Sequence, residues 1–264
     1  MTSFTELLSA ITIGEGIHRL TTPSSWMQGR TLYGGISAAL CFEAVTRDFP
    51  DLPPLRSAQI AFVGPSGGDI TMATRLLRQG KSAAFVASDL SVDGAVGTHG
   101  VFCFGSDRPS RHNATAPTAP EVPPPDDCPT FFPPDRYPKF IANFDLRLAR
   151  GAPPVSSAQE ADNTVWVRHR DRHAPSTLTK LLALADAAPP AAISLLNEPA
   201  PISTMTWSFD VVSPDEQDEA DDGWYLCRST ADAIGDGYSC QSMSVWSANG
   251  TPLLLGRQTI AMFT

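Results

Sequence analysis

The stretch that decides the fold is Gly34-Gly35-Ile36-Ser37-Ala38-Ala39-Leu40-Cys41-Phe42-Glu43-Ala44-Val45. Small and apolar side chains cover nearly its whole helical circumference, and such a helix is buried on all sides. Glu43 is the one charged residue in the run. We therefore predict a buried helix in the first half of the chain, directly after two glycines.

A second helix is predicted near residue 180. Its apolar residues recur at i, i+3, i+4 and i+7, the spacing of one helical face. These residues are Leu178, Leu181, Leu182 and Ala185. Ser176 or Thr177 can cap its start. Pro189-Pro190 ends it, because a residue that precedes proline avoids helical backbone.

Strand-like runs follow each helix. The predicted strands are 59–63, 100–104, 206–212 and 253–263. Asp93-Gly94 and Asn249-Gly250 lie between such runs, and both dipeptides favour type I′ hairpin turns. The order is an irregular opening, a helix and an antiparallel meander, twice over. It predicts an α+β fold made of a repeated unit.

Ten prolines crowd residues 106–138. Proline fixes φ and lacks an N–H, so this segment is neither helix nor central strand. We interpret it as an extended linker. It divides the chain into a first unit at 1–107, a linker at 108–138 and a second unit at 139–264. As a spacer, it should tolerate deletions within 114–125.

The composition restricts the partners. The chain has 264 residues, of which 42% are hydrophobic and 18% charged, with a formal net charge of −9. An acidic protein is a poor partner for nucleic acid or an anionic membrane. No apolar run approaches the ~18 residues of a membrane span, and we expect no signal peptide. Five irregularly spaced cysteines indicate reduced thiols, which predicts a cytoplasmic location.

The chain resembles the double-hotdog acyl-CoA thioesterases, typified by bacterial thioesterase II. Gly29-Arg30-Thr31-Leu32-Tyr33-Gly34-Gly35 is similar to the segment before the family's first buried helix. Ile60-Ala61-Phe62-Val63-Gly64-Pro65 is similar to a strand that ends in an R-P-G turn, although the arginine is missing here. The resemblance implies a double hotdog, hydrolysis of acyl-CoA to free acid and CoA, no cofactor and a role in fatty acid metabolism.

The resemblance also implies three residues that orient a water. Asp186 matches the aspartate at the end of the second helix, Thr204 the hydroxyl residue of the next strand, and Gln258 the glutamine of the last strand. The family's best-known members have Asp-His where this chain has Thr206-Trp207. They have Glu-Gly where it has Thr259-Ile260. These departures leave the substrate range in doubt.

The position of Asp186 suggests chemistry without the family. It lies four residues after Leu182, at the edge of an apolar face and at the C-terminal end of the predicted helix. The helix dipole and burial both disfavour its charged form, so its pKa should rise toward that of an effective general base. A purely structural carboxylate would show the same features.

The other candidates are less distinctive. Gln258 lies on an apolar strand face, where its amide must hold a water, a substrate carbonyl or a neighbouring strand. Thr204 shares its predicted strand face with Thr206 and Ser208, so its role rests on the resemblance. Glu43 is a base in a second site, the partner of an arginine, or a side chain that extends to solvent at the helix end.

Substrate contacts follow from the chemistry of acyl-CoA. The acyl chain should lie in an apolar slot between helix and sheet. A backbone N–H near Gly34 or Gly35 can stabilise the oxyanion. The CoA diphosphate needs basic side chains, for which Arg30, Arg75 and Arg78 are the candidates.

Two other functions stay open. A hotdog enoyl-CoA hydratase usually has an aspartate and a histidine around an N-P-x-H stretch, which this sequence lacks. A non-catalytic acyl-binding protein would keep the fold without the chemistry. His169 and His173 are four residues apart, but Pro175 follows and no third ligand is near, so we expect no metal. Exposed sheet edges would favour a homo-oligomer such as a dimer.

Overall fold

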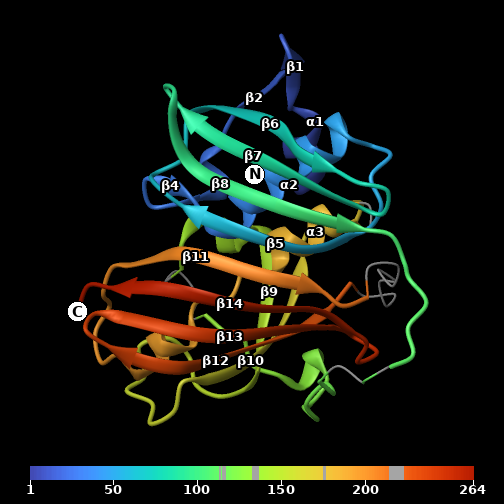
Figure 1. Cartoon of the computed structure of the whole chain (residues 1–264). Coiled ribbons are helices and arrows are strands. Elements are labelled where there is room, and N and C mark those ends of the chain that lie inside the picture. The colour runs from blue at the N-terminus through green and yellow to red at the C-terminus, as the bar shows by residue number, and fades with distance from the viewer. Residues whose placement is uncertain (113, 115–116, 133–136, 175–176, 214–222) are drawn as a thin grey trace.

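The computed structural model describes residues 1–112, 114, 117–132, 137–174, 177–213 and 223–264. In these residues, twelve strands form one antiparallel sheet in the order β1-β2-β6-β7-β8-β5-β11-β14-β13-β12-β10-β9 (Figure 1). Strands β3 (Met27–Gln28) and β4 (Thr31–Leu32) form a separate pair. The strands of the large sheet are β1 (Thr12–Gly14), β2 (Ile17–Thr21), β5 (Leu55–Phe62), β6 (Asp69–Gln79), β7 (Ala83–Val92), β8 (Ala95–Gly105), β9 (Phe144–Arg150), β10 (Asp162–His169), β11 (Ile202–Val211), β12 (Tyr225–Gly235), β13 (Tyr238–Ser247) and β14 (Pro252–Met262).

The two halves of the chain meet in the middle of this sheet. Strand β5 of the first half pairs with β11 of the second, with Ser208 opposite Gln59 at the centre of the paired stretch. Figure 1 shows the first half above this junction and the second half below it. The ladder is therefore continuous from one half to the other.

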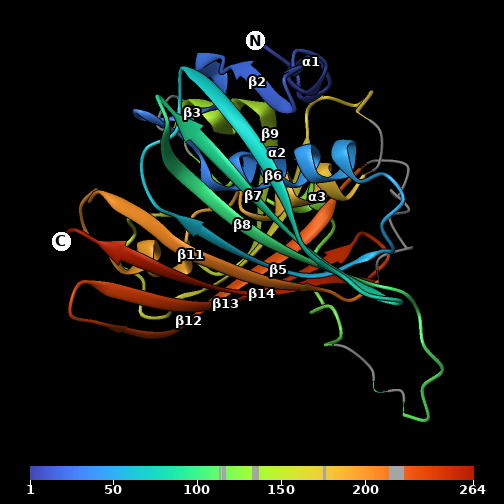
Figure 2. The ribbon, with the colours of Figure 1, turned by 45° about the horizontal axis from the view of Figure 1, so that its top comes forward.

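The helices lie on one side of the sheet (Figure 2). They are α1 (Phe4–Ser9), α2 (Gly34–Asp48) and α3 (Leu178–Ala185). The chain also has short 3₁₀ turns at η1 (Ser24–Trp26), η2 (Pro125–Asp127), η3 (Lys139–Asn143) and η4 (Ala191–Leu195). Helices α2 and α3 pack against each other. In the part of the chain that the structure describes, none of the helices has the length and apolarity needed to cross a membrane.

Both predicted helices are present. Helix α2 buries the residues from Gly35 to Phe42, as its apolar circumference predicts. Helix α3 starts after Thr177, whose side chain accepts a hydrogen bond from the Lys180 N–H at 3.2 Å. All eight residues of α3 are buried. The helix ends before the predicted proline pair, because Asp186 already serves as its C-cap.

The hairpin predictions are partly wrong. Asp93 and Gly94 have φ values of 49° and 80° and join β7 to β8, as a type I′ turn requires. At Asn249-Gly250 only the glycine has positive φ, and the loop is wider, closed by the Ser247 N–H on the Thr251 carbonyl at 2.9 Å. In the second half a tight turn of this kind lies instead at Asp236-Gly237, between β12 and β13.

The predicted irregular openings of the two halves are also wrong. Helix α1 and the β1–β2 hairpin precede α2, and the β9–β10 hairpin precedes α3. These strands extend the sheet at its two ends. The short lengths and mixed burial of β1 and β2 hide the alternation that identifies a strand, and β10 is buried on both faces, so its sequence shows no alternation either.

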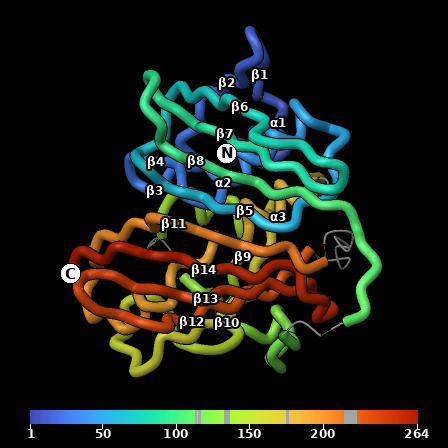
Figure 3. The backbone as a smooth tube through the Cα atoms, viewed as in Figure 1, coloured from blue at the N-terminus to red at the C-terminus, as the bar shows by residue number. Residues whose placement is uncertain are grey.

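The proline-rich segment is more than a spacer. After β8 the chain passes along the side of the molecule to the second half (Figure 3). The indole N–H groups of Trp246 and Trp166 donate to the carbonyl oxygens of Pro117 and Pro123 at 2.8 and 2.9 Å. Cys128 is buried in the same aromatic cluster. We therefore withdraw the expectation that residues 114–125 can be deleted freely.

Candidate active site

Two glycines allow the end of α3 to approach the start of α2. A Cβ atom on Gly35 would lie 2.9 Å from the Ala183 carbonyl oxygen and 3.0 Å from the Asp186 Cβ. A Cβ on Gly34 would lie 2.7 Å from the Asp186 Oδ2. The hydroxyl of Tyr33, the residue before these glycines, donates to the Ala183 carbonyl. The predicted segment before the first helix thus positions Asp186.

Asp186 is a partly buried carboxylate with two hydrogen-bond donors. The Gln258 Nε2 donates to its Oδ1 at 2.5 Å, and the Gly35 backbone N–H donates to the carboxylate as well. Burial raises the Asp186 pKa from 3.8 to about 6, although the two hydrogen bonds oppose this rise. The direction agrees with the prediction from sequence. The carboxylate ionises close to neutral pH, as a general base requires.

Gln258 belongs to a pair of buried amides. It lies on β14 opposite Gln241 of β13, and both side chains are almost fully buried. The Gln241 Nε2 donates to the Gln258 Oε1 at 2.7 Å. The Ala191 backbone N–H donates to the Gln241 Oε1 at 3.1 Å. Sequence reasoning missed Gln241, although alternation along β13 places it on the same buried face as Ser239 and Met243.

A β-bulge turns Thr204 toward the site. Thr204 pairs with Ile260, but Thr206 already pairs with Thr259, so Met205 is the extra residue. Directly paired residues point to the same face of a sheet, so Thr204 shares the face of Ile260 and therefore of Gln258. The expectation that Thr204 shares a face with Thr206 is wrong, because simple alternation ignores the bulge.

A cavity of about 720 Å³ opens beside Asp186. Thr204, Gly34 and Arg30 also line it. Much of its wall is apolar and comes from both halves, including Leu32, Phe62, Phe132, Phe140, Ile141 and Ile193. Gln258 does not line the cavity and reaches it through Asp186. The cavity can hold an apolar chain with its reacting end at the carboxylate.

The predicted basic residues divide into two groups. Arg30 is exposed and lines the cavity. Arg75 and Arg78 are exposed on β6, which is three strands away from β5 in the sheet, and neither lines the cavity. The structure therefore brings only Arg30 together with the other predicted residues.

Glu43 has structural partners. Its Oε1 accepts a hydrogen bond from the Arg47 Nε at 2.8 Å, and its Oε2 accepts from the Thr179 Oγ1 at 2.9 Å. The pairing with an arginine, one of the predicted roles, is confirmed. The contact with Thr179 links α2 to the first turn of α3.

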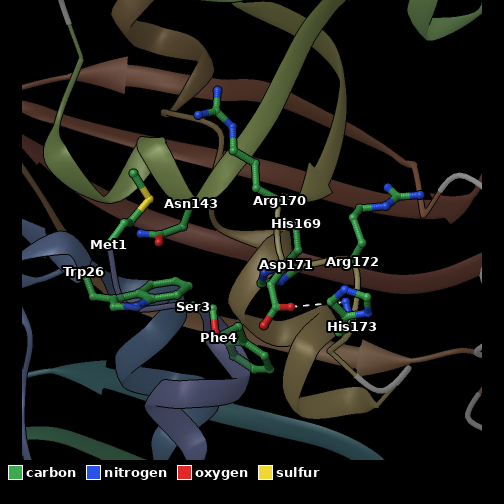
Figure 4. A pocket seen from close by; sticks show the side chains of 10 residues that line it. All are labelled: Met1, Ser3, Phe4, Trp26, Asn143, His169, Arg170, Asp171, Arg172 and His173. Carbon is green, nitrogen blue, oxygen red and sulfur yellow. Dashed lines mark hydrogen bonds between the residues drawn. The ribbon is translucent and has the colours of Figure 1, made fainter.

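A second cavity, of about 320 Å³, lies between α1, η1 and the segment after β10 (Figure 4). It contains none of the predicted catalytic residues. His169 lines it and donates from Nε2 to the Lys180 carbonyl at 3.0 Å. Burial lowers the His169 pKa to about 3, so the ring is neutral at physiological pH. This histidine helps to hold β10 against α3.

Solved structures share this architecture over the whole chain. A hotdog-fold protein from Alicyclobacillus acidocaldarius matches with a TM-score of 0.88 and 24% identity, covering 100% of this chain and 99% of that chain. A protein assigned as a thioesterase II from Thermobifida fusca YX matches with a TM-score of 0.84 and 20% identity, covering 100% and 98%. The acyl-CoA thioesterase II from Mycobacterium marinum matches with a TM-score of 0.76 and 15% identity, covering 98% of both chains. No curated protein matches the sequence.

These likenesses and the repeated helix-on-sheet unit define the chain as a double hotdog, which confirms the predicted α+β fold. Two family models then identify it further. The acyl-CoA thioesterase C-terminal domain matches residues 125–262, and the acyl-CoA thioesterase N-terminal domain matches residues 22–105. The chain belongs to the acyl-CoA thioesterase family. It is a thioester hydrolase, and its substrates are acyl-CoA thioesters.

Proposed function

We propose that Asp186 is the general base that activates water for hydrolysis of the acyl-CoA thioester. One observation carries this proposal. Asp186 is a partly buried carboxylate with a pKa of about 6, it is hydrogen-bonded to Gln258, and it lines the same cavity as Thr204. Above this pKa the carboxylate is ionised and can take a proton from water. General-base catalysis of this kind contributes ~10²–10⁴-fold in rate.

Thr204 and Gln258 hold the water in this proposal. The Gln258 Nε2 has two hydrogens, and one already bonds Asp186. Its second hydrogen and the Thr204 hydroxyl can bind the water beside the carboxylate. Both side chains lie on the helix-facing side of the sheet, which keeps the water in line with the thioester carbon. Such positioning is worth several kcal/mol, of the ~7–11 that full orientation can supply.

The reaction closes without a covalent intermediate. The water oxygen bonds to the thioester carbon while Asp186 accepts its proton, and the carbonyl electrons move to the oxygen. The Gly34 N–H is at the first position of α2, outside the intrahelical hydrogen bonds, and it can stabilise this oxyanion. The Gly35 N–H is already bonded to Asp186. The C–S bond then breaks, and the CoA sulfur receives the proton from Asp186.

The lining of the cavity favours one orientation of the substrate. The acyl chain lies along the apolar wall, the thioester lies at Asp186, and Arg30 at the cavity faces the CoA diphosphate. We do not extend the CoA site to Arg75 and Arg78, because they lie on β6, outside the cavity.

Several further assignments belong to the proposal. We propose units at 1–107 and 139–264 joined by the linker at 108–138. We propose a cytoplasmic enzyme of fatty acid metabolism, a location supported by the five free cysteines. We propose a homodimer as well. The sheet ends in β1 and β9, and an unpaired edge strand can pair with the edge strand of a second copy.

The test combines an acyl-CoA panel with Asp186→Asn. We expect the wild type to release CoA from at least one of acetyl-, octanoyl-, palmitoyl- and phenylacetyl-CoA. Asp186→Asn keeps the shape of the side chain but removes the basic oxygen, so kcat should fall ~10²–10⁴-fold with the fold intact. Loss of thioester ultraviolet absorbance measures the rate, and circular dichroism checks the fold.

Glu43→Gln is the matched control, because Glu43 is the carboxylate of the other helix. It should change stability modestly and kcat little. An inactive Glu43→Gln beside an active Asp186→Asn would move the site to the first half. If no acyl-CoA is cleaved, the acyl-binding protein becomes the better interpretation. Hydration of an enoyl-CoA would instead favour the hydratase.

A further inference from the structure

A chain of hydrogen bonds leads from a backbone N–H to the proposed base. It runs from the Ala191 N–H to the Gln241 Oε1, from the Gln241 Nε2 to the Gln258 Oε1, and from the Gln258 Nε2 to Asp186, at 3.1, 2.7 and 2.5 Å. Gln241 and Gln258 are 1% and 2% exposed, so bulk solvent does not compete for these bonds. A buried amide without hydrogen-bond partners destabilises the folded state, which favours formation of all three hydrogen bonds.

This series of hydrogen bonds has only one consistent donor-to-acceptor direction. A backbone N–H can only donate, so the Gln241 atom that faces Ala191 must be its oxygen. The Gln241 NH₂ group then faces Gln258, which must turn its own oxygen toward it. The Gln258 NH₂ group is left for Asp186, whose ionised carboxylate can only accept. The Ala191 N–H at one end of the series and the Asp186 carboxylate at the other therefore impose the same orientation on the two amides.

We propose that Gln241 is a positioning residue, which locks the Gln258 amide with its NH₂ group toward Asp186 and the water. This inference rests on the proposed function of Asp186. With its oxygen held by Gln241, Gln258 acts only as a donor in the site. A reversed Gln258 would lose the bond to Gln241 and place its oxygen against the carboxylate. Gln241 itself does not line the cavity.

The local structure fixes Gln241 from two sides. Its partner Ala191 starts η4, which follows Asp186 closely in sequence and contributes Ile193 to the cavity wall. Residues 155–158 donate backbone N–H groups to the carbonyls of η4 and its C-cap Leu196. Val155 and Ser157 adopt positive φ values of 57° and 54° there, a conformation that non-glycine residues rarely take. Turn η4, whose Ala191 N–H orients Gln241, is therefore held in place by hydrogen bonds from residues 155–158.

The test is Gln241→Met, which keeps the length of the side chain and removes its amide. We expect kcat to fall ~10–100-fold, because the water and base lose their fixed geometry. KM should stay within about twofold, since Gln241 does not reach the substrate. The hydrogen bond from Gln258 lowers the Asp186 pKa. Loss of this hydrogen bond should therefore raise the Asp186 pKa and move the acid limb of the pH–kcat profile to higher pH. A merely structural role would reduce stability and leave this limb in place.

Gln241→Glu is the conservative variant. Its protonated carboxyl group can accept from Ala191 and donate to Gln258, so activity should survive at any pH where Asp186 is ionised and this Glu is still protonated. Its ionised form can only accept, so activity should fall as Glu ionises, and the profile should become bell-shaped. Gln59→Met makes the same chemical change on the exposed face of β5 and should leave the profile unchanged. Rates are measured with the acyl-CoA of the panel that the wild type cleaves fastest.

Two outcomes separate this inference from the proposed function. If Gln241→Met keeps the wild-type kcat and acid limb while Asp186→Asn is inactive, the positioning role is overturned and the base stands. If Asp186→Asn keeps the wild-type kcat, the proposed function fails first, whatever the Gln241 variants do.

Discussion

At the scale of single residues, the burial of Asp186 has an energetic cost. A pKa raised from 3.8 to about 6 means that the folded protein disfavours the ionised form. The corresponding free energy is about 3 kcal/mol. The same burial makes the carboxylate a stronger base. Function and stability therefore oppose each other at this residue.

This opposition predicts a pH dependence of stability. Between about pH 4 and pH 6 the folded state keeps a proton on Asp186 that the unfolded state has lost. The free energy of unfolding should therefore fall as the pH rises through this window. Asp186→Asn removes the effect. Its free energy of unfolding relative to wild type should rise by up to about 3 kcal/mol from pH 4 to pH 7. Urea unfolding across this range measures it, and a difference independent of pH would contradict the buried base.

The predictability of the site residues differed for physical reasons. The raised pKa of Asp186 could be predicted from its place at the end of an apolar helical face. Gln258 could be singled out because an amide on an apolar strand face needs partners. Gln241 alternates with Ser239 and Met243, but it lies in a run of polar and small residues, so this face does not stand out as apolar. The role of Ala191 belongs to its backbone N–H, which the sequence does not reveal.

At the scale of elements, the contact between α2 and α3 depends on Gly35. A methyl group there would press on the Tyr33 ring at 2.7 Å and on the Ala183 carbonyl at 2.9 Å. We expect Gly35→Ala to lower the free energy of unfolding by about 1–3 kcal/mol, the typical cost of overpacking. It should also lower kcat, because Asp186 would move. Chemical denaturation and the thioesterase assay measure the two effects.

Gly235→Ala is the control for this change. Gly235 lies at the end of β12, and its Cβ would meet no atom within 4 Å. Its free energy of unfolding should stay within about 0.5 kcal/mol of wild type. A Gly35→Ala variant that behaved like this control would show that the helices can separate without loss.

The elements themselves were predicted unevenly. Helix α2 could be predicted because a continuous apolar surface has few alternatives. The turn at Asp93-Gly94 followed from residues that tolerate positive φ. The bulge at Met205 could not be predicted, because one extra residue leaves no mark on composition and reverses the faces beyond it. The error on the face of Thr204 has this cause alone.

At the scale of the whole molecule, hydrogen bonds attach the proline-rich segment to the surface of the second half. Trp246→Phe and Trp166→Phe each remove one indole N–H that holds this segment at Pro117 or Pro123. Each should lower the free energy of unfolding by about 0.5–1.5 kcal/mol. Each should also speed proteolytic cleavage within the linker, with kcat almost unchanged. Limited proteolysis followed by mass spectrometry locates the cuts.

Trp224→Phe is the comparison in the same aromatic cluster. The Trp224 ring lies 4.4 Å from the Arg168 guanidinium carbon. This variant should lose packing without loosening the linker. Equal cleavage in all three variants would mean that the cluster, and not the two indole hydrogen bonds, retains the segment.

The pairing of β5 with β11 makes the proposed catalytic centre a shared property of the two halves. Gly34 and Gly35 come from one half, and Asp186 and Gln258 from the other. A chain cut once in the linker would give two fragments, neither of which contains a complete centre. Thioesterase activity would then return only on reassembly. The molecule is thus a ready scaffold for a split-enzyme reporter, in which a coloured thiol assay signals that two fused proteins have met.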